Sequence, residues 1–130
     1  MRISPAPRRR PHAVALPIAL ALIGCVCGQS VAQQAAVGGD PNRGATLIRQ
    51  SGCGACHEIP GIEGADGLVG PPLNRIASRI YIAGVLRNTP ASMTAWLRDP
   101  QAIVPGNAMP NVGLTEKDAR DVAAYLFTLR

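Results

Sequence analysis

The stretch Cys53-Gly54-Ala55-Cys56-His57 decides the fold of this chain. Two thiols three positions apart can each add to one vinyl group of a haem, and the His directly after them can reach the iron from the same face. This C-x-x-C-H pattern is the sequence signal for covalent attachment of a c-type haem. The sequence therefore predicts one haem c per chain, with Cys53 and Cys56 carrying the attachment and His57 as an iron ligand.

Two other interpretations of the motif have less support. A zinc site would need a second pair of ligands downstream, but no Cys follows Cys56 and no His follows His57. A thioredoxin-like redox pair would begin a helix in a βαβ unit, and no alternation of strands and helices is visible here.

The first 32 residues have the pattern of a secretory signal. Arginines at positions 2, 8, 9 and 10 precede an apolar run over residues 13–26, and Ser30-Val31-Ala32 is a small-x-small cleavage site. The run is too short to be a convincing membrane span. As an alternative, Leu22-Ile23-Gly24-Cys25 resembles a lipobox, in which Cys25 would become a lipidated first residue. Either way we expect export to the periplasm, with a short lead-in over residues 33–39 and one domain over residues 40–130.

Removal of the signal also removes most of the positive charge. The whole chain of 130 residues carries a formal charge of +5, but the 98 residues after Ala32 hold nine basic against eight acidic side chains, a charge of +1. A nucleic-acid partner therefore has no support.

Helix signals divide the mature chain into three main helices. The first begins at Asp40-Pro41, with Asp as N-cap, and ends at Gly52 before the motif. The third runs from Thr115 to about Leu129, opened by a capping box with Asp118. Its small apolar residues suit close packing against Gly44 on the first helix.

The second helix begins at Thr89-Pro90 and runs to about Arg98, where Pro100 closes it. Residues 59–70 and 101–113 are rich in Gly and Pro and are predicted loops, with a short helical turn over residues 74–78. No segment shows convincing period-two alternation, so we predict an all-α fold. With one Trp, one Phe and two Tyr, the domain needs the haem as part of its core.

Two methionines are candidates for the second axial ligand, since His12 leaves with the signal. Met93 lies on an apolar helix face, where Met usually fills the core. Met109 lies between Pro105 and Pro110 in a stiff loop, which suits the presentation of a thioether. The spacing favours Met109 and leaves Met93 as the alternative.

The segment Gly70-Pro71-Pro72-Leu73 has two interpretations. A ligand His usually donates its other ring N–H to a carbonyl or carboxylate, and a prolyl carbonyl here is a good candidate. A plain turn stiffened by Pro explains the segment equally well.

Four segments together resemble the class I cytochromes c: the haem motif, Gly70 to Leu73, Pro105 to Pro110, and residues 121–126. Residues 82–100 are also similar to the cytochrome c domain fused to subunit II of haem–copper oxidases. The resemblance covers residues 40–130 and implies a small cytochrome c fold, three main helices and loops wrapped around one haem.

The resemblance also implies roles for individual residues. Cys53 and Cys56 would carry the thioethers, His57 and Met109 would be the axial ligands, and the Pro71 carbonyl would accept from His57. Around the haem it implies that Trp96 packs beside Met109 and that Arg79 lies near a propionate. Tyr81 or Asn88 would assist Arg79 there. The Lys ring that mitochondrial cytochrome c uses for docking is absent, since Lys117 is the only Lys.

These expectations amount to a periplasmic electron-transfer protein, not an enzyme. It would pass single electrons from a dehydrogenase or a bc1-type, quinol-oxidising complex to a terminal oxidase or reductase, and would contact the membrane only if Cys25 is lipidated. Alternatives are a haem c subunit of a larger oxidoreductase, a haem-based ligand sensor in which Met109 leaves, and a module without haem.

Overall fold

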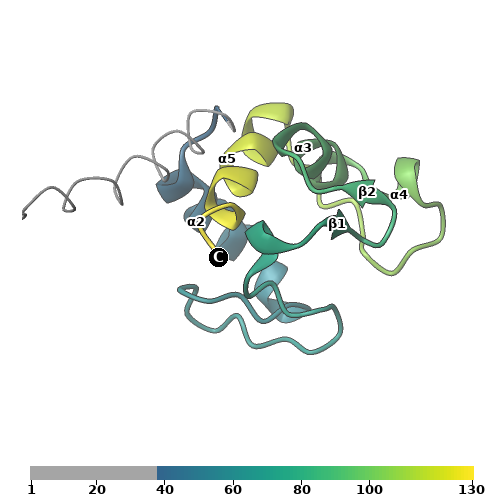
Figure 1. The fold of residues 1–130 in the computed structure, drawn as a ribbon. Helices are drawn as coiled ribbons and strands as arrows, with labels where there is room; N and C mark the ends of the chain where they lie inside the picture. Colours follow the sequence, from purple (N-terminus) through teal and green to yellow (C-terminus); the bar gives the residue numbers. More distant parts are fainter. Residues whose placement is uncertain (1–37) are drawn as a thin grey trace, which may run out of the picture.

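The computed structural model describes residues 38–130, and helices make up most of it (Figure 1). The predicted signal, its cleavage site and the lipobox at Cys25 lie outside the described residues, as does most of the lead-in. The last lead-in residue, Gly39, packs so closely on the C-terminal helix that a Cβ there would lie 2.3 Å from the carbonyl oxygen of Arg120.

Three main helices form the frame, as the capping signals predicted. They are α2 (Pro41–Gln50), α3 (Pro90–Arg98) and α5 (Glu116–Leu126). The side chains of Asp40, Thr89 and Thr115 cap their first turns, and Thr115 and Asp118 form the predicted capping box. The chain past Leu126 continues as hydrogen-bonded turns, so α5 ends earlier than the predicted limit near Leu129.

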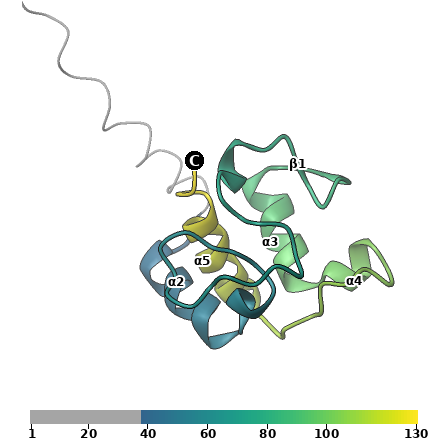
Figure 2. The ribbon, with the colours of Figure 1, turned by 90° about the horizontal axis from the view of Figure 1, so that it is seen from below.

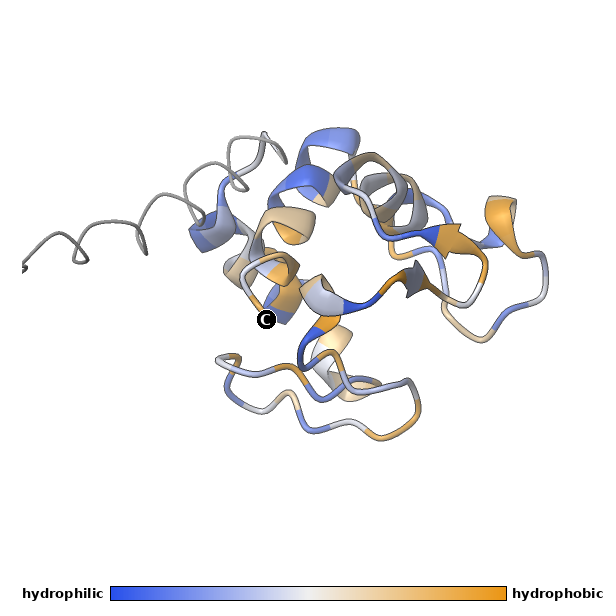
Figure 3. Cartoon of the chain, in the orientation of Figure 1, coloured by the Kyte–Doolittle hydropathy of each residue, from blue (hydrophilic) through white to orange (hydrophobic). Residues whose placement is uncertain are grey.

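Helices α2 and α5 cross at close range, and α3 packs on the other side of α5 (Figures 1 and 2). The crossing is possible because Gly44 has no side chain. A Cβ on Gly44 would lie 2.0 Å from the carbonyl oxygen of Asp121. Figure 3 shows that α5 is hydrophilic in its first turns and more apolar further along, where Val122, Ala123 and Leu126 are buried.

Two short elements add to the predicted pattern. A two-stranded antiparallel sheet pairs β1 (Tyr81–Ile82) with β2 (Leu86–Arg87), and α4 (Pro100–Ile103) occupies the start of a segment predicted as loop. Strands of two residues are too short to show alternation, so the all-α prediction missed them. Pro100 both follows α3 and opens α4, because Asp99 ends the first helix and caps the second.

Two single turns complete the elements. They are the 3-10 turns η1 (Cys53–Ala55) and η2 (Ile76–Ser78). The second lies inside the predicted helical turn over residues 74–78. In the described part of the chain, no helix is long and apolar enough to cross a membrane.

Candidate functional site

The C-x-x-C-H motif lies at a sharp turn directly after α2. Gly52 takes a left-handed conformation with φ +70°, and η1 follows, closed by hydrogen bonds from the N–H groups of Cys56 and His57 to the carbonyl of Cys53. Both cysteines are half-buried free thiols. Burial raises the pKa of the Cys53 thiol.

The loop of residues 59–70 lies directly on the motif. The N–H of Gly67 donates to the carbonyl of Gly54 at 3.0 Å. The N–H of Gly70 donates to the carbonyl of Cys56 at 2.7 Å. Glycine is needed at the contacts, since a Cβ on Gly67 would lie 2.4 Å from the carbonyl oxygen of Ala55. The loop therefore fixes the backbone that carries the two cysteines.

His57 is held from two sides by the last residue of this loop and the residue after it. Its Nδ1 lies 2.7 Å from the carbonyl oxygen of Pro71, which can only accept, so Nδ1 carries the proton. Gly70 lies against the imidazole, because a Cβ there would be 2.3 Å from the ring carbon Cε1. The lone pair of Nε2 is then available for a metal.

The two candidate methionines have different environments. Met93 is 2 % exposed and packs in the hydrophobic core, as a filler does. Met109 is half-buried, and its Sδ accepts a hydrogen bond of 3.1 Å from the indole Nε1–H of Trp96. A thioether sulfur has two lone pairs, so this contact leaves one for a metal.

The other predicted haem contacts lie on η2 and the sheet. The guanidinium of Arg79 donates to the carbonyls of Pro72 and Asn74, which brings it to the segment that holds His57. Asn88 donates through Nδ2 to the carbonyls of Ile76 and Arg79, at 2.7 and 2.9 Å. Its Oδ1 is the only buried side-chain polar atom without a partner in the part of the chain that the structure describes.

Tyr81 lies on β1 opposite Arg87. It is 51 % exposed, and its ring lies 5.5 Å under the guanidinium of Arg87 on the facing strand. The structure thus brings together His57 with Pro71, Trp96 with Met109, and Arg79 with Asn88.

The donor set fits a c-type haem. Among residues 38–130, no group of three or more His, Cys, Asp or Glu could hold a metal ion. One imidazole nitrogen and one thioether sulfur, together with two free thiols beside the imidazole, are the set that a covalent haem requires. The guanidinium of Arg79 can donate to the carboxylate groups at a haem edge, whereas the unpartnered Oδ1 of Asn88 is an acceptor and needs a donor.

Two residues of the site were not predicted from the sequence. The side-chain amides of Gln101 on α4 and Asn107 bond to the loop that carries Met109. An Asn next to Gly in a Pro-rich loop is a turn signal, but nothing in the sequence shows which carbonyls it meets.

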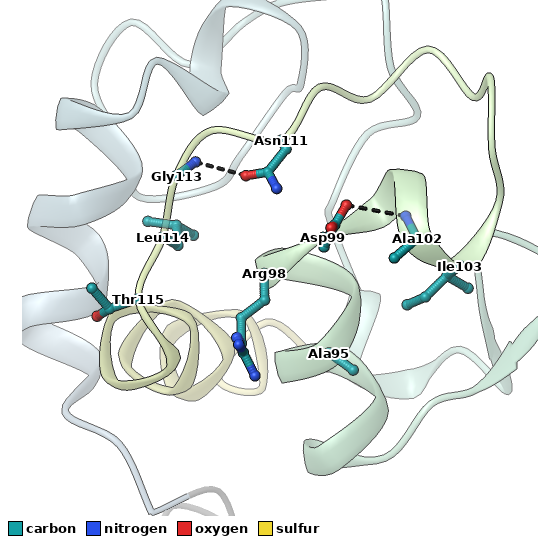
Figure 4. Close-up of a pocket in the computed structure, with 9 residues that line it drawn as sticks. All are labelled: Ala95, Arg98, Asp99, Ala102, Ile103, Asn111, Gly113, Leu114 and Thr115. Atoms are coloured by element: carbon teal, nitrogen blue, oxygen red, sulfur yellow. Dashed lines mark hydrogen bonds between the residues drawn. The ribbon is translucent and has the colours of Figure 1, made fainter.

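A hollow of about 540 Å³ lies between the end of α3, α4 and the start of α5 (Figure 4). Its lining includes Arg98, Asp99, Ala102 and Asn111, and none of the predicted haem contacts. The dashed hydrogen bonds in Figure 4 show that Asp99 and Asn111 are already paired with backbone N–H groups.

Comparisons with known proteins point to one family. Residues 41–130 match the model of the cytochrome c family. The chain is 31 % identical over 124 residues to cytochrome c2 of Rhodomicrobium vannielii, covering 85 % of this chain and 94 % of the relative. It is 34 % identical over 108 residues to a c-type cytochrome, cyt cy, of Rhodobacter capsulatus, covering 73 % of this chain and 52 % of the relative.

A second group of relatives is much longer than this chain. Cytochrome c oxidase subunit 2 of Alkalihalophilus pseudofirmus is 34 % identical over 90 residues. That match covers 68 % of this chain but only 25 % of the subunit, so the similarity spans about a quarter of the longer protein.

Proposed function

The chain belongs to the cytochrome c family, and we propose from this premise that it is a one-electron carrier with one haem c and His57/Met109 axial ligation. Cys53 and Cys56 would hold the haem covalently. The haem supplies the Fe(III)/Fe(II) couple, and a Met ligand raises the reduction potential of that couple.

The observation that carries the proposal is that both candidate ligands are already held by the protein. Pro71 and Gly70 fix the imidazole of His57, and Trp96 fixes the sulfur of Met109. Ligands that are held in both oxidation states keep the reorganisation on electron transfer small. With both axial positions filled by side chains, the site suits electron transfer and not substrate binding.

The surface next to the motif supports docking by apolar contact. Leu68 and Val69 are 88 % and 79 % exposed, and they lie between Gly67 and Gly70, which bond to the motif backbone. The charge of +1 after Ala32 and the single Lys117 give little electrostatic steering. We therefore propose weak, transient partners, with a dehydrogenase or bc1-type complex as donor and an oxidase or reductase as acceptor.

Export to the periplasm is part of the same proposal. It is supported by the signal pattern of residues 1–32, and by the need to join haem to the cysteines outside the cytoplasm. Cleavage after Ala32 would give a free carrier, whereas lipidation at Cys25 would attach it to the membrane.

A second candidate is a haem c subunit of a larger oxidoreductase. The relatives named cytochrome c oxidase subunit 2 favour it, because their matching segment is only part of a longer chain. A stable complex found on purification from the membrane would distinguish this role from that of a free carrier.

The function is tested by a redox titration of the purified holoprotein, followed by exposure of the ferrous form to carbon monoxide. A carrier with both axial positions filled gives a single one-electron transition and no carbon monoxide complex at neutral pH. Rapid binding of carbon monoxide would contradict the proposal and indicate a ligand sensor.

A further inference from the structure

The backbone of Met109 is held by two side-chain amides. Its N–H donates to Oδ1 of Asn107 at 2.8 Å, and its carbonyl accepts from Nε2 of Gln101 at 2.8 Å. Both polar backbone groups of the candidate ligand residue are therefore paired with side chains, and neither belongs to a helix or strand.

The same two amides also bond to the rest of the loop. Gln101 Nε2 donates to the carbonyl of Asn107 at 2.9 Å, and Gln101 Oε1 accepts from the N–H of Gly106 at 3.0 Å. Asn107 Nδ2 donates to the carbonyls of Pro100 and Val104, at 2.9 and 2.7 Å. All four polar side-chain atoms thus have partners within residues 100–109.

Apolar burial contributes little to the turn directly before Met109. Pro105, Gly106, Ala108 and Pro110 are exposed, so the turn before Met109 gains little from apolar burial. Gly106 takes φ +79°, a conformation that costs other residues free energy. The position of Met109 depends on the two amides, on the contact of its sulfur with Trp96 and on the packing of its side chain against the core.

We propose that Gln101 and Asn107 form an amide latch that keeps the Met109 thioether in place and resists its replacement by other ligands. The latch rests on the proposed function, since it matters only if Met109 is an axial ligand. Gln101 and Asn107 are positioning residues, because they act through the backbone of Met109.

The test is a titration of the ferric holoprotein with imidazole, which competes with a thioether for the sixth position. In Gln101→Leu, a side chain of similar size makes none of the three hydrogen bonds. The dissociation constant for imidazole is expected to fall roughly 10- to 100-fold, the size expected for the loss of two or three hydrogen bonds. Asn107→Asp keeps the acceptor for the Met109 N–H but sets a carboxylate oxygen against the carbonyls of Pro100 and Val104, so a fall of at least this size is expected.

Ala102→Gln is the matched control. Ala102 is exposed on the same short helix and lines the separate hollow in Figure 4, so the latch stays intact. The dissociation constant of imidazole for the Ala102→Gln protein is expected to stay within about twofold of the wild-type value. Unchanged imidazole binding in both latch variants would overturn the latch.

Hydrogen exchange in the same holoproteins separates a latch from a general structural role. The latch predicts faster exchange in residues 104–109 and unchanged exchange in α5, whereas equal loss of protection in both segments would contradict it. Met109→Ala tests the function separately. If that variant keeps the methionine-to-iron absorption band, both proposals fail, and if it loses the band while the latch variants bind imidazole normally, only the latch fails.

Discussion

The proposed ligation is most sensitive to the contact between the sulfur of Met109 and the indole of Trp96. A hydrogen bond from Nε1–H draws electron density from the sulfur and weakens its donation to a metal. Since Fe(III) needs that donation more than Fe(II), the contact would favour the reduced form of a haem iron bound by Met109. Trp96 is 8 % exposed, so the bond is shielded from water.

We predict that Trp96→Phe lowers the reduction potential by about 20–60 mV, the one-electron equivalent of part of one hydrogen bond. Spectroelectrochemical titration of the holoprotein measures it. Phe127→Leu, a truncation of another buried aromatic residue, is the control, because it lowers stability without touching the sulfur. A potential equal to that of the wild type in Trp96→Phe would show that the indole N–H does not act on the ligand.

At the scale of elements, the crossing of α2 and α5 is the contact that fixes how the main helices pack together. Gly44 lies where the backbones meet, and Gly39 makes a second close approach to α5. Only Ser51 and Gly52 lie between the end of α2 and the first residue of the haem motif. A change in this crossing therefore reaches the cysteines through a short connection.

Gly44→Ala tests the crossing. An Ala normally stabilises a helix by up to about 1 kcal/mol relative to Gly, but here its Cβ would meet the backbone of Asp121. We predict a net loss of about 1–3 kcal/mol in the free energy of unfolding, measured with guanidinium chloride. Thr46→Ala on the exposed face of α2 should change that free energy by less than about 0.5 kcal/mol. A stabilised Gly44→Ala protein would show that the helices are further apart than described.

The elements also show where sequence reasoning succeeds. Helix starts at Asp40, Thr89 and Thr115 were predictable because a cap and its partners lie within four residues of each other. The contact of α5 with the loop of residues 59–70 could not be predicted, since Tyr125 donates to the carbonyl of Pro60, which lies 65 residues away in the sequence. The latch could not be predicted for the same reason, because a side-chain amide can bond to many backbone carbonyls and only the fold determines which of them it meets.

For the whole molecule, Asp121 joins the two ends of the described chain. This buried carboxylate accepts from the Asp40 N–H at 2.8 Å, from Lys117 at 2.9 Å and from Arg43. Burial alone would raise the pKa of Asp121, but the hydrogen bonds outweigh it and lower the pKa to about 2.

A lowered pKa gives stability that is present above the pKa of the unfolded chain and lost as the pH falls towards the pKa of the folded one. We predict that Asp121→Asn is less stable than the wild type by about 2 kcal/mol at pH 6, and that the difference disappears between about pH 4 and pH 2. Unfolding in guanidinium chloride at a series of pH values measures it.

Glu116→Gln is the control for that series. Glu116 is an exposed carboxylate paired with Arg98 and Arg120, and such surface pairs contribute little. If the Asp121→Asn difference stayed constant from pH 6 to pH 2, the carboxylate would not be stabilised in its charged form.

The central claim is that the chain holds one covalent haem between His57 and Met109, and the visible spectrum of the ferric holoprotein tests it most directly. Alongside an intact mass that includes one haem, the account predicts a low-spin spectrum with the weak far-red band of methionine ligation. That band should vanish in Met109→Ala and persist in Met93→Leu. A high-spin spectrum in the wild type, or a band that depends on Met93 instead, would contradict the account.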